Sequence, residues 1–446
     1  MDLSSLMGVN KHEEEQKASF EYTAQTASPI VSGEVKLTIE ENSVTITSLF
    51  DTIEIAFAEI NALSFADYVV TVKTDSGDFP FCRMGSWAQP FYDALRDAYN
   101  KAVLRSLFIK GSPILTARGD FRYSEKGING GGAASIHVYE NNVTALTPNL
   151  SARRLPLCFV TGMEKGDYEL TLKLDPGESY TFAKLGYDTA HFSDAVEKQI
   201  QALRNKSLAA IKELDPTLTA AQASQVARLM PEGAAATFGQ LAQIAPSFVA
   251  SLEEKLANTR ATEYYAVFKT LRDPAQIYVG FRKNDTGAES GALPNMGGIH
   301  DGLGDGGNSM ETLSNLKNVK TPAGSGKTGE PTPDPYLLWM IAPSPDGQYA
   351  SVEFTEANSA TFVYKTGGDF DGFARQLNRA LEAISFKREV ILMADDELCK
   401  PENSDYYMAA KRTMSLQFIR SNFTGRIIHS SLESWKRKLL ELWSGM

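Results

Sequence analysis

The chain of 446 residues repeats part of itself once in its first half, and this repeat constrains the fold more than any other feature of the sequence. Six residues recur in the same order at an offset of 100: Asp67, Tyr68, Thr71, Lys73, Asp75 and Gly77 return as Asp167, Tyr168, Thr171, Lys173, Asp175 and Gly177. After one inserted residue, Phe81, Gly85 and Phe91 return as Phe182, Gly186 and Phe192. The correspondence extends over about 60 residues with single-residue slips, so the two segments should share one fold.

Each copy is predicted to form several strands followed by one helix. Val35, Leu37 and Ile39 alternate with polar residues, which is the period-2 pattern of half-buried strands. The run from Asp75 to Asp78 predicts a hairpin turn, because Asp and Gly tolerate tight-turn dihedrals. Pro90 then opens a helix with apolar residues at steps of four, namely Phe91, Leu95, Tyr99 and Val103. The second copy repeats this order, with Gly130 to Gly132 expected as a turn before a strand at Ile136.

A bent antiparallel sheet of about seven short strands, closed by one C-terminal amphipathic helix, resembles the pleckstrin-homology (PH-like) superfold. The resemblance covers about residues 20–105 and 110–210 and is carried by the order of the elements. It implies an α+β fold of tandem PH-like units, joined to a helical connector and a C-terminal helical tail. Tandem PH-like modules in adaptor proteins and histone-chaperone subunits bind partners and do not catalyse, so the resemblance implies a binding function.

The rest of the chain is predicted to continue the same plan. PH-like unit 1 is expected at residues 18–106 and unit 2 at 107–213, followed by a helical connector at 214–260. A degenerate third PH-like unit is expected at 261–390, with strands from Tyr264 to Arg282. It would contain a flexible Gly-rich loop at 284–335, since that stretch has hardly an aromatic residue to bury. The helical tail at 391–446 is expected to contain two helices, one with Tyr407, Met414 and Phe418 and one from Ser431.

Charge and cysteine usage narrow the class of protein. The chain has 44 lysines and arginines against 55 aspartates and glutamates, a net charge of −11, so nucleic acid is not expected as a partner. It has no signal-peptide pattern and no uncharged apolar run of about 18 residues. Cys82, Cys158 and Cys399 form no CxxC pair and are expected to be inert thiols. These features predict a cytoplasmic protein.

No catalytic, cofactor or metal site is predicted. Gly326-Lys327-Thr328 is similar to the end of a phosphate-binding loop, but Thr321 stands where the first glycine is required. The acidic glycine run at 301–308 lacks the final Glu of a calcium loop. The five histidines have no HExxH spacing, and no GxSxG elbow is present. Phosphoinositide binding is not expected either, because Lys36 is opposed by neighbouring glutamates and Arg118 and Arg122 flank Asp120.

The C-terminus is the one basic part of this acidic chain. From Tyr406 to Met446 there are seven basic residues and two acidic ones. In the last predicted helix an apolar stripe lies beside three basic residues, a pattern typical of helices that lie on a membrane surface or dock in a partner's groove. The eight candidate docking residues are Leu432, Trp435, Lys436, Arg437, Lys438, Leu439, Leu442 and Trp443. Packing of the stripe on the protein's own third unit is the alternative.

These patterns favour a non-enzymatic cytoplasmic scaffold that uses repeated PH-like modules to bind protein partners through exposed sheet edges or grooves. One alternative is a peripheral membrane adaptor that docks through the basic C-terminal helix. A second alternative is a chaperone of basic proteins or nucleoproteins, for which the net charge of −11 would suit the client.

Overall fold

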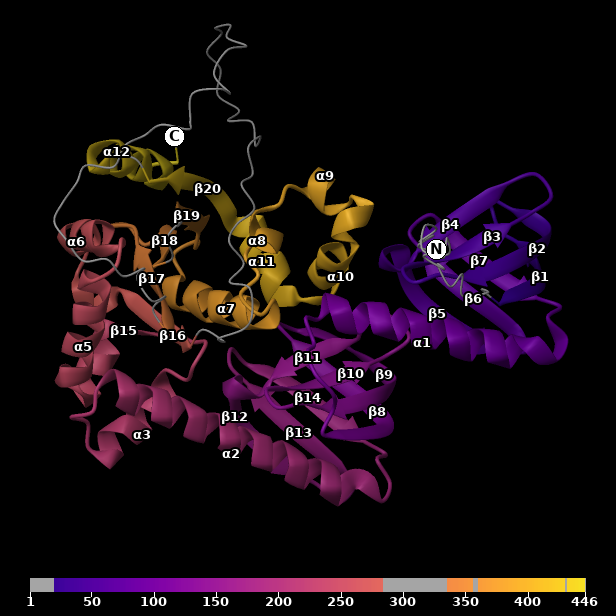
Figure 1. The fold of residues 1–446 in the computed structure, drawn as a ribbon, viewed down its shortest axis with the longest axis horizontal. Coiled ribbons are helices and arrows are strands. Elements are labelled where there is room, and N and C mark those ends of the chain that lie inside the picture. Colours follow the sequence, from indigo (N-terminus) through magenta and orange to yellow (C-terminus); the bar gives the residue numbers. More distant parts are fainter. Residues whose placement is uncertain (1–19, 284–334, 356–359, 430, 446) are drawn as a thin grey trace, which may run out of the picture. The chain divides into compact units, whose positions relative to one another are not determined.

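The computed structural model describes residues 20–283, 335–355, 360–429 and 431–445. Gly326-Lys327-Thr328, the acidic run at 301–308 and the remainder of segment 284–334 lie outside the described residues. The chain divides into two compact units. Figure 1 labels the helices and strands of both. Unit 1 contains residues 1–205 and 375–421, and unit 2 contains residues 206–374 and 422–446. Neither unit is a single continuous stretch of chain.

The first sheet of unit 1 has seven antiparallel strands in the order β4-β3-β2-β1-β7-β6-β5, followed by a 3-10 turn and helix α1 (Ala88–Ser106). Phe91, Leu95, Tyr99 and Val103 of α1 are buried in the core of this sheet, because residues at steps of four share one face of a helix. We call β1 to α1 the first module. Its strands are β1 (Glu21–Ala27), β2 (Ser32–Ile39), β3 (Ser43–Thr47), β4 (Thr52–Ala56), β5 (Ile60–Ala66), β6 (Val69–Thr74) and β7 (Gly77–Cys82).

The second sheet of unit 1 has the same strand order, β11-β10-β9-β8-β14-β13-β12, and leads into helix α2 (Asp188–Leu214). The two sheets also share an irregularity, since the register shifts between Ile60 and Ala62 in one and between Val160 and Gly162 in the other. We call β8 to α2 the second module. Its strands are β8 (Leu115–Glu125), β9 (Ile128–Val138), β10 (Asn142–Leu146), β11 (Arg153–Pro156), β12 (Val160–Lys165), β13 (Glu169–Leu174) and β14 (Glu178–Ala183).

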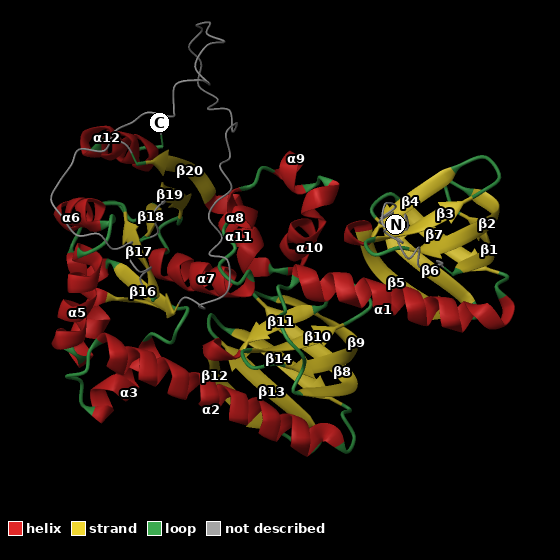
Figure 2. Ribbon diagram, in the orientation of Figure 1, coloured by secondary structure: helices red, strands yellow, loops and turns green. Residues whose placement is uncertain are grey.

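These modules confirm the predicted fold class, which is α+β with tandem PH-like units (Figure 2). One local prediction was wrong. Gly130, Gly131 and Gly132 form no turn but lie inside β9, and the turn before it is at Lys126-Gly127. A Cβ on Gly130 would lie 2.4 Å from the Tyr123 hydroxyl and one on Gly131 would lie 2.0 Å from the Phe121 carbonyl oxygen. Glycine is therefore needed here for close approach to β8, a use of strand glycines that resembles a turn signal in sequence.

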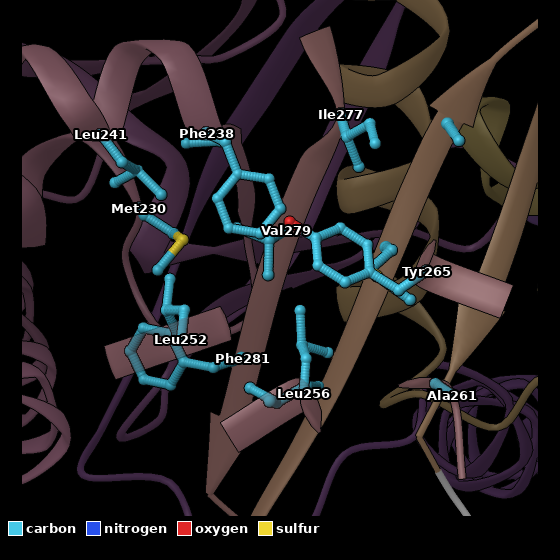
Figure 3. Packing of buried hydrophobic residues seen from close by; sticks show 14 of the residues in the cluster. Met230, Phe238, Leu241, Leu252, Leu256, Ala261, Tyr265, Ile277, Val279 and Phe281 are labelled. Atoms are coloured by element: carbon cyan, nitrogen blue, oxygen red, sulfur yellow. The ribbon is translucent and has the colours of Figure 1, made fainter. Parts of the chain in front are cut away.

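Unit 2 contains a six-stranded antiparallel sheet in the sequential order β15-β16-β17-β18-β19-β20. Apolar side chains of the connector helices pack on it: Met230, Phe238, Leu252 and Leu256 lie against Val279 and Phe281 of β16 (Figure 3). The strands are β15 (Ala235–Thr237), β16 (Tyr278–Lys283), β17 (Tyr336–Pro343), β18 (Tyr349–Phe354), β19 (Ala360–Lys365) and β20 (Phe423–Ile428). The connector helices are α3 (Ala220–Leu229), α4 (Phe238–Ile244), α5 (Pro246–Ala257) and α6 (Thr262–Leu271).

The third sheet departs from the expected third PH-like unit. It lacks the strand order of the two modules, and its edge strands β15 and β20 come from segments expected to be a helical connector and a helical tail. Tyr264 and Tyr265, expected in a strand, lie in α6, where they are buried together with Phe268. Their spacing fits one face of a helix as well as a short alternating run, so periodicity alone could not decide. The unit boundaries inferred from the sequence stay predictions.

Short helices complete the C-terminal third. Helix α7 (Phe370–Ala383) begins in unit 2 and ends in unit 1. The helix expected to contain Tyr407, Met414 and Phe418 is two helices, because the chain breaks at Thr413, whose backbone is extended. The remaining helices are α8 (Glu389–Leu392), α9 (Asp395–Leu398), α10 (Ser404–Arg412), α11 (Met414–Asn422) and α12 (Leu432–Trp443).

Candidate functional site

The apolar stripe of α12, predicted as a docking surface, lies largely in the core of unit 2. Trp435, Leu439 and Trp443 are buried there. The indole N–H groups of the two tryptophans donate to Thr361 Oγ1 at 2.7 Å and to Ser351 Oγ at 2.9 Å. Buried indoles require such partners, so the helix is held by specific polar contacts as well as by apolar area. Docking through these three side chains would require the helix to leave this position.

Of the other five predicted docking residues, Leu442 packs against the core of unit 2 and the remaining four lie toward solvent. Leu442 and Lys436 are partly buried, whereas Arg437, Lys438 and Leu432 are exposed. Arg437 lies 3.8 Å from the Glu441 carboxylate. A shallow hollow on the solvent face of α12 is lined by Leu440, Ser444 and four charged residues. Two of these are acidic and two are basic, so the hollow has no net charge; they are Glu433, Glu441, Lys436 and Arg437. A docking role for the eight residues stays a prediction.

The edges of the two modules offer a different kind of surface, and one of them is occupied. The Leu63 N–H of β5 donates to the Pro148 carbonyl at 2.7 Å, and Ala62 forms a β-bridge with Asn149. Both partners belong to the loop that joins β10 to β11 in the second module. Leu146 and Ala152, at the two ends of this loop, are buried in the core of the first module. The second module therefore adds a short loop, bridged at Asn149, to the edge of the first.

The equivalent edge of the second module is β12, and it is open. At an offset of 100, Met163 corresponds to Leu63. Because the register shift is the same in both sheets, the Met163 N–H points away from β13 just as the Leu63 N–H points away from β6. Within the described part of the chain, β12 pairs with β13 alone, and no residue bonds to the outer backbone of residues 161–165. Such an edge is a template for pairing with another chain.

The opposite edge of this sheet, β11, is covered by the C-terminal half of α7 through buried charges. Arg154 donates to the carbonyls of Glu382 and Ala383 at 2.8 and 2.9 Å, and it pairs with the Glu382 carboxylate at 3.3 Å. Arg379 pairs with Glu178 at 3.1 Å and donates to the Arg154 carbonyl at 3.3 Å. Removing one member of such a pair would leave a buried charge uncompensated, so these contacts hold α7 on β11.

A second layer of polar side chains supports these pairs. Arg153 pairs with Glu125 at 3.0 Å and lies over the Tyr123 ring. The Tyr180 hydroxyl donates to Glu125 at 2.8 Å and also contacts Glu178. Burial raises the pKa of Tyr180 well above its usual value, so the group stays a neutral donor. The cluster is rich in ionisable groups, but the cavity that it lines has room for about one water molecule.

Other residues singled out from the sequence have structural surroundings. Lys36 pairs with Glu21 at 2.6 Å, and Arg122 pairs with Glu169 at 3.1 Å. Burial also raises the pKa of the Cys158 thiol well above its usual value, which keeps the thiol protonated and unreactive. Among the described residues, no group of three or more His, Cys, Asp or Glu side chains is placed to hold a metal ion. No helix in the described ranges is long and apolar enough to cross a membrane.

Comparisons with known proteins do not assign a family. No family model matches the sequence, and no curated protein matches it. The structure is similar to 48 chains of solved structures, one of them described as the structure of the Spt16D Pob3N heterodimer. That chain is 14% identical to this one, and the match covers 36% of this chain and 86% of that chain with a TM-score of 0.16. At this TM-score the match supports no statement about function.

Proposed function

We propose that this chain is a protein-interaction scaffold and that its second module binds a loop or turn of a protein partner along the outer edge of β12. The observation that carries the proposal is the occupied edge of the first module. There Leu63 and Ala62 of β5 already contact a loop of the second module, at the positions that correspond to Met163 and Gly162 of β12. The two edges have the same pairing register and the same irregularity, so they offer the same main-chain groups.

The chemistry of recognition follows from the strand. A carbonyl of the partner would accept from the Met163 N–H, as the Pro148 carbonyl accepts from Leu63. Main-chain bonds of this kind give affinity, and side chains that flank the strand give selectivity. Glu164 and Lys165 are exposed and lie beside this position. A non-enzymatic role and a cytoplasmic location belong to the same proposal, as do the boundaries 18–106 and 107–213 inferred from the sequence for the two PH-like units.

A photo-crosslinking residue at Thr161, which is exposed on β12, tests the proposal in cells of the source organism. We expect crosslinks to one defined segment of a protein, mapped by mass spectrometry, and we expect Met163→Pro to abolish them because proline removes the outer N–H. Proline is tolerated on an edge strand where the N–H faces outward, so the module should stay folded. The matched control is the same crosslinker at Tyr168, an exposed residue in the turn after β12. Crosslinking at Thr161 that is no stronger than at Tyr168 contradicts the proposal.

A further inference from the structure

The first module contains the counterpart of the loop that docks on β5. In the second module this loop joins β10 to β11, and in the first module the equivalent connection is the turn from Ser48 to Asp51 between β3 and β4. At an offset of 99, Leu49 and Phe50 correspond to Pro148 and Asn149, the two residues that contact β5. Leu49 and Phe50 are each 87% exposed. The first module therefore presents a turn in the docking position with two large apolar side chains in water.

Hydrogen bonds within the turn hold Leu49 and Phe50 in their exposed positions. The Ser48 N–H donates to the Asp51 carbonyl at 2.8 Å, and Ser48 Oγ accepts from the Asp51 and Phe50 N–H groups at 2.9 and 3.3 Å. A serine side chain that bonds to the backbone two and three residues ahead holds a turn in one conformation. Little conformational freedom remains to be lost on binding, so the turn is well prepared to act as an anchor.

We propose that the β3–β4 turn of one copy docks on the open β12 edge of a second copy, and so repeats between molecules the contact that the β10–β11 loop makes with β5 inside one molecule. This inference rests on the proposed function, since it names the partner of the same edge. The Leu49 carbonyl takes the place of the Pro148 carbonyl as acceptor from the Met163 N–H. Leu49 and Phe50 lose contact with water against the partly buried Gly162 and Met163.

The symmetry of this contact predicts how the assembly grows. The turn and the edge are different surfaces, and each copy has one of each, so the contact is heterologous. Contacts of this type continue from copy to copy into a ring or an open chain. A four-residue turn on one strand is a small interface, and small interfaces are weak and transient. The association should therefore depend steeply on protein concentration.

Sedimentation equilibrium of the purified full chain tests the inference with two complementary variants. The double variant Leu49→Asp, Phe50→Asp lacks the apolar turn but keeps the edge, and Met163→Pro lacks the edge donor but keeps the turn. We expect the unmodified chain to increase in mean mass with concentration and each variant alone to stay monomeric. An equimolar mixture of the two variants should form a dimer that grows no further, since only one intact contact can form. Tyr68→Asp, which changes a 75% exposed residue in the β5–β6 turn, should associate like the unmodified chain.

Three results would each overturn the inference: an unmodified chain that is monomeric at every concentration, a turn variant that associates as strongly as the unmodified chain, or a mixture of variants that stays monomeric. The turn variant alters only exposed side chains, so its melting temperature should match that of the unmodified chain. A lower mean mass of this variant would then reflect weaker association and not unfolding. A monomeric chain whose Thr161 crosslinker captures one defined segment of another protein would refute this inference and support the proposed function. A monomeric chain without such crosslinks would refute both.

Discussion

The indole nitrogen of Trp435 lies 2.7 Å from the hydroxyl oxygen of Thr361, so the terminal helix is tied by a hydrogen bond to strand β19 of the third sheet. Tyr264 and Phe268 of α6 pack edge-on against the same indole. An amphipathic helix fixed in this way stabilises unit 2 whether or not it also docks on a partner.

Trp435→Ala should lower the free energy of unfolding of unit 2 by about 3–5 kcal/mol, because it leaves a large cavity. It also removes the indole bond to the Thr361 hydroxyl, which keeps its bond to the Glu353 carboxylate. Urea unfolding of the full chain, followed by tryptophan fluorescence and circular dichroism, measures this loss. Leu440→Ala on the same helix is the control; Leu440 is 42% exposed, and a change of about 0.5 kcal/mol or less is expected. Equal effects of the two substitutions would show that the stripe is not part of the core.

Arg379→Met should destabilise unit 1 by about 3–5 kcal/mol, since it leaves the buried Glu178 carboxylate without its cation. The double variant Arg379→Met, Glu178→Met should recover much of this loss, because replacing both partners leaves no uncompensated charge. Arg122→Met, which breaks the exposed pair with Glu169, should change stability by only about 0–1 kcal/mol. Urea unfolding at neutral pH compares the three. A double variant as unstable as the single one would mean that packing, not charge, holds α7 on β11.

We expect His137 to make the stability of unit 1 depend on pH near neutrality. Burial lowers the pKa of His137 below its usual value of 6.5. The unfolded chain then binds a proton near pH 6.5 that the folded chain does not bind, so stability is full above that pH and falls as the pH drops below it. His137→Gln should reduce this loss between about pH 8 and pH 5, whereas His191→Gln, at an exposed site, should not. A pH profile that is identical in the His137 variant and the unmodified chain contradicts the assignment.

Gly131 and Gly132 have nearly the same backbone angle, with φ of 144° and 145°, but different surroundings. A Cβ on Gly131 would lie 2.0 Å from the Phe121 carbonyl oxygen, whereas a Cβ on Gly132 meets nothing within 4 Å. Gly131→Ala should therefore destabilise unit 1 by about 3 kcal/mol and Gly132→Ala by about 1 kcal/mol. Thermal unfolding of the two variants gives the difference directly, and a larger loss for Gly132→Ala would contradict the close approach of β8 and β9.

The two modules could be predicted from the sequence because a repeat reports the same pattern twice. The alternation of apolar and polar residues in β2 and the apolar stripe of α1 each had a counterpart in the second copy. A pattern that occurs twice rarely arises by chance. The third sheet had no second copy for comparison, and its edge strands β15 and β20 are far from its centre in sequence. Short apolar runs such as the one at Tyr264 fit a helix and a strand equally well, so only tertiary packing decides between them.

The open edge was not identified from the sequence, although one signal was available. The repeat aligns Met163 with Leu63. The hydrogen bond from Leu63 to Pro148, however, joins two modules, and a periodic pattern in the sequence gives no information about such contacts. The turn at Leu49 and Phe50 was visible as two large apolar residues between Ser48 and Asp51, where a turn would ordinarily be polar. The burial of Trp435 followed the alternative left open for the terminal helix, packing on the chain's own core.

The division of the chain into two discontinuous units has a consequence for synthesis on the ribosome. Residues 375–421 belong to unit 1, yet they are translated after most of unit 2. Arg379 and Glu178 are 201 residues apart, so the charged groups on β11 and β14 emerge long before the groups that neutralise them. During that interval the side chains of Arg154 and Glu178 must be hydrated by water or covered by a chaperone. A nascent chain arrested before residue 375 should therefore be a stronger chaperone client than one arrested after residue 421.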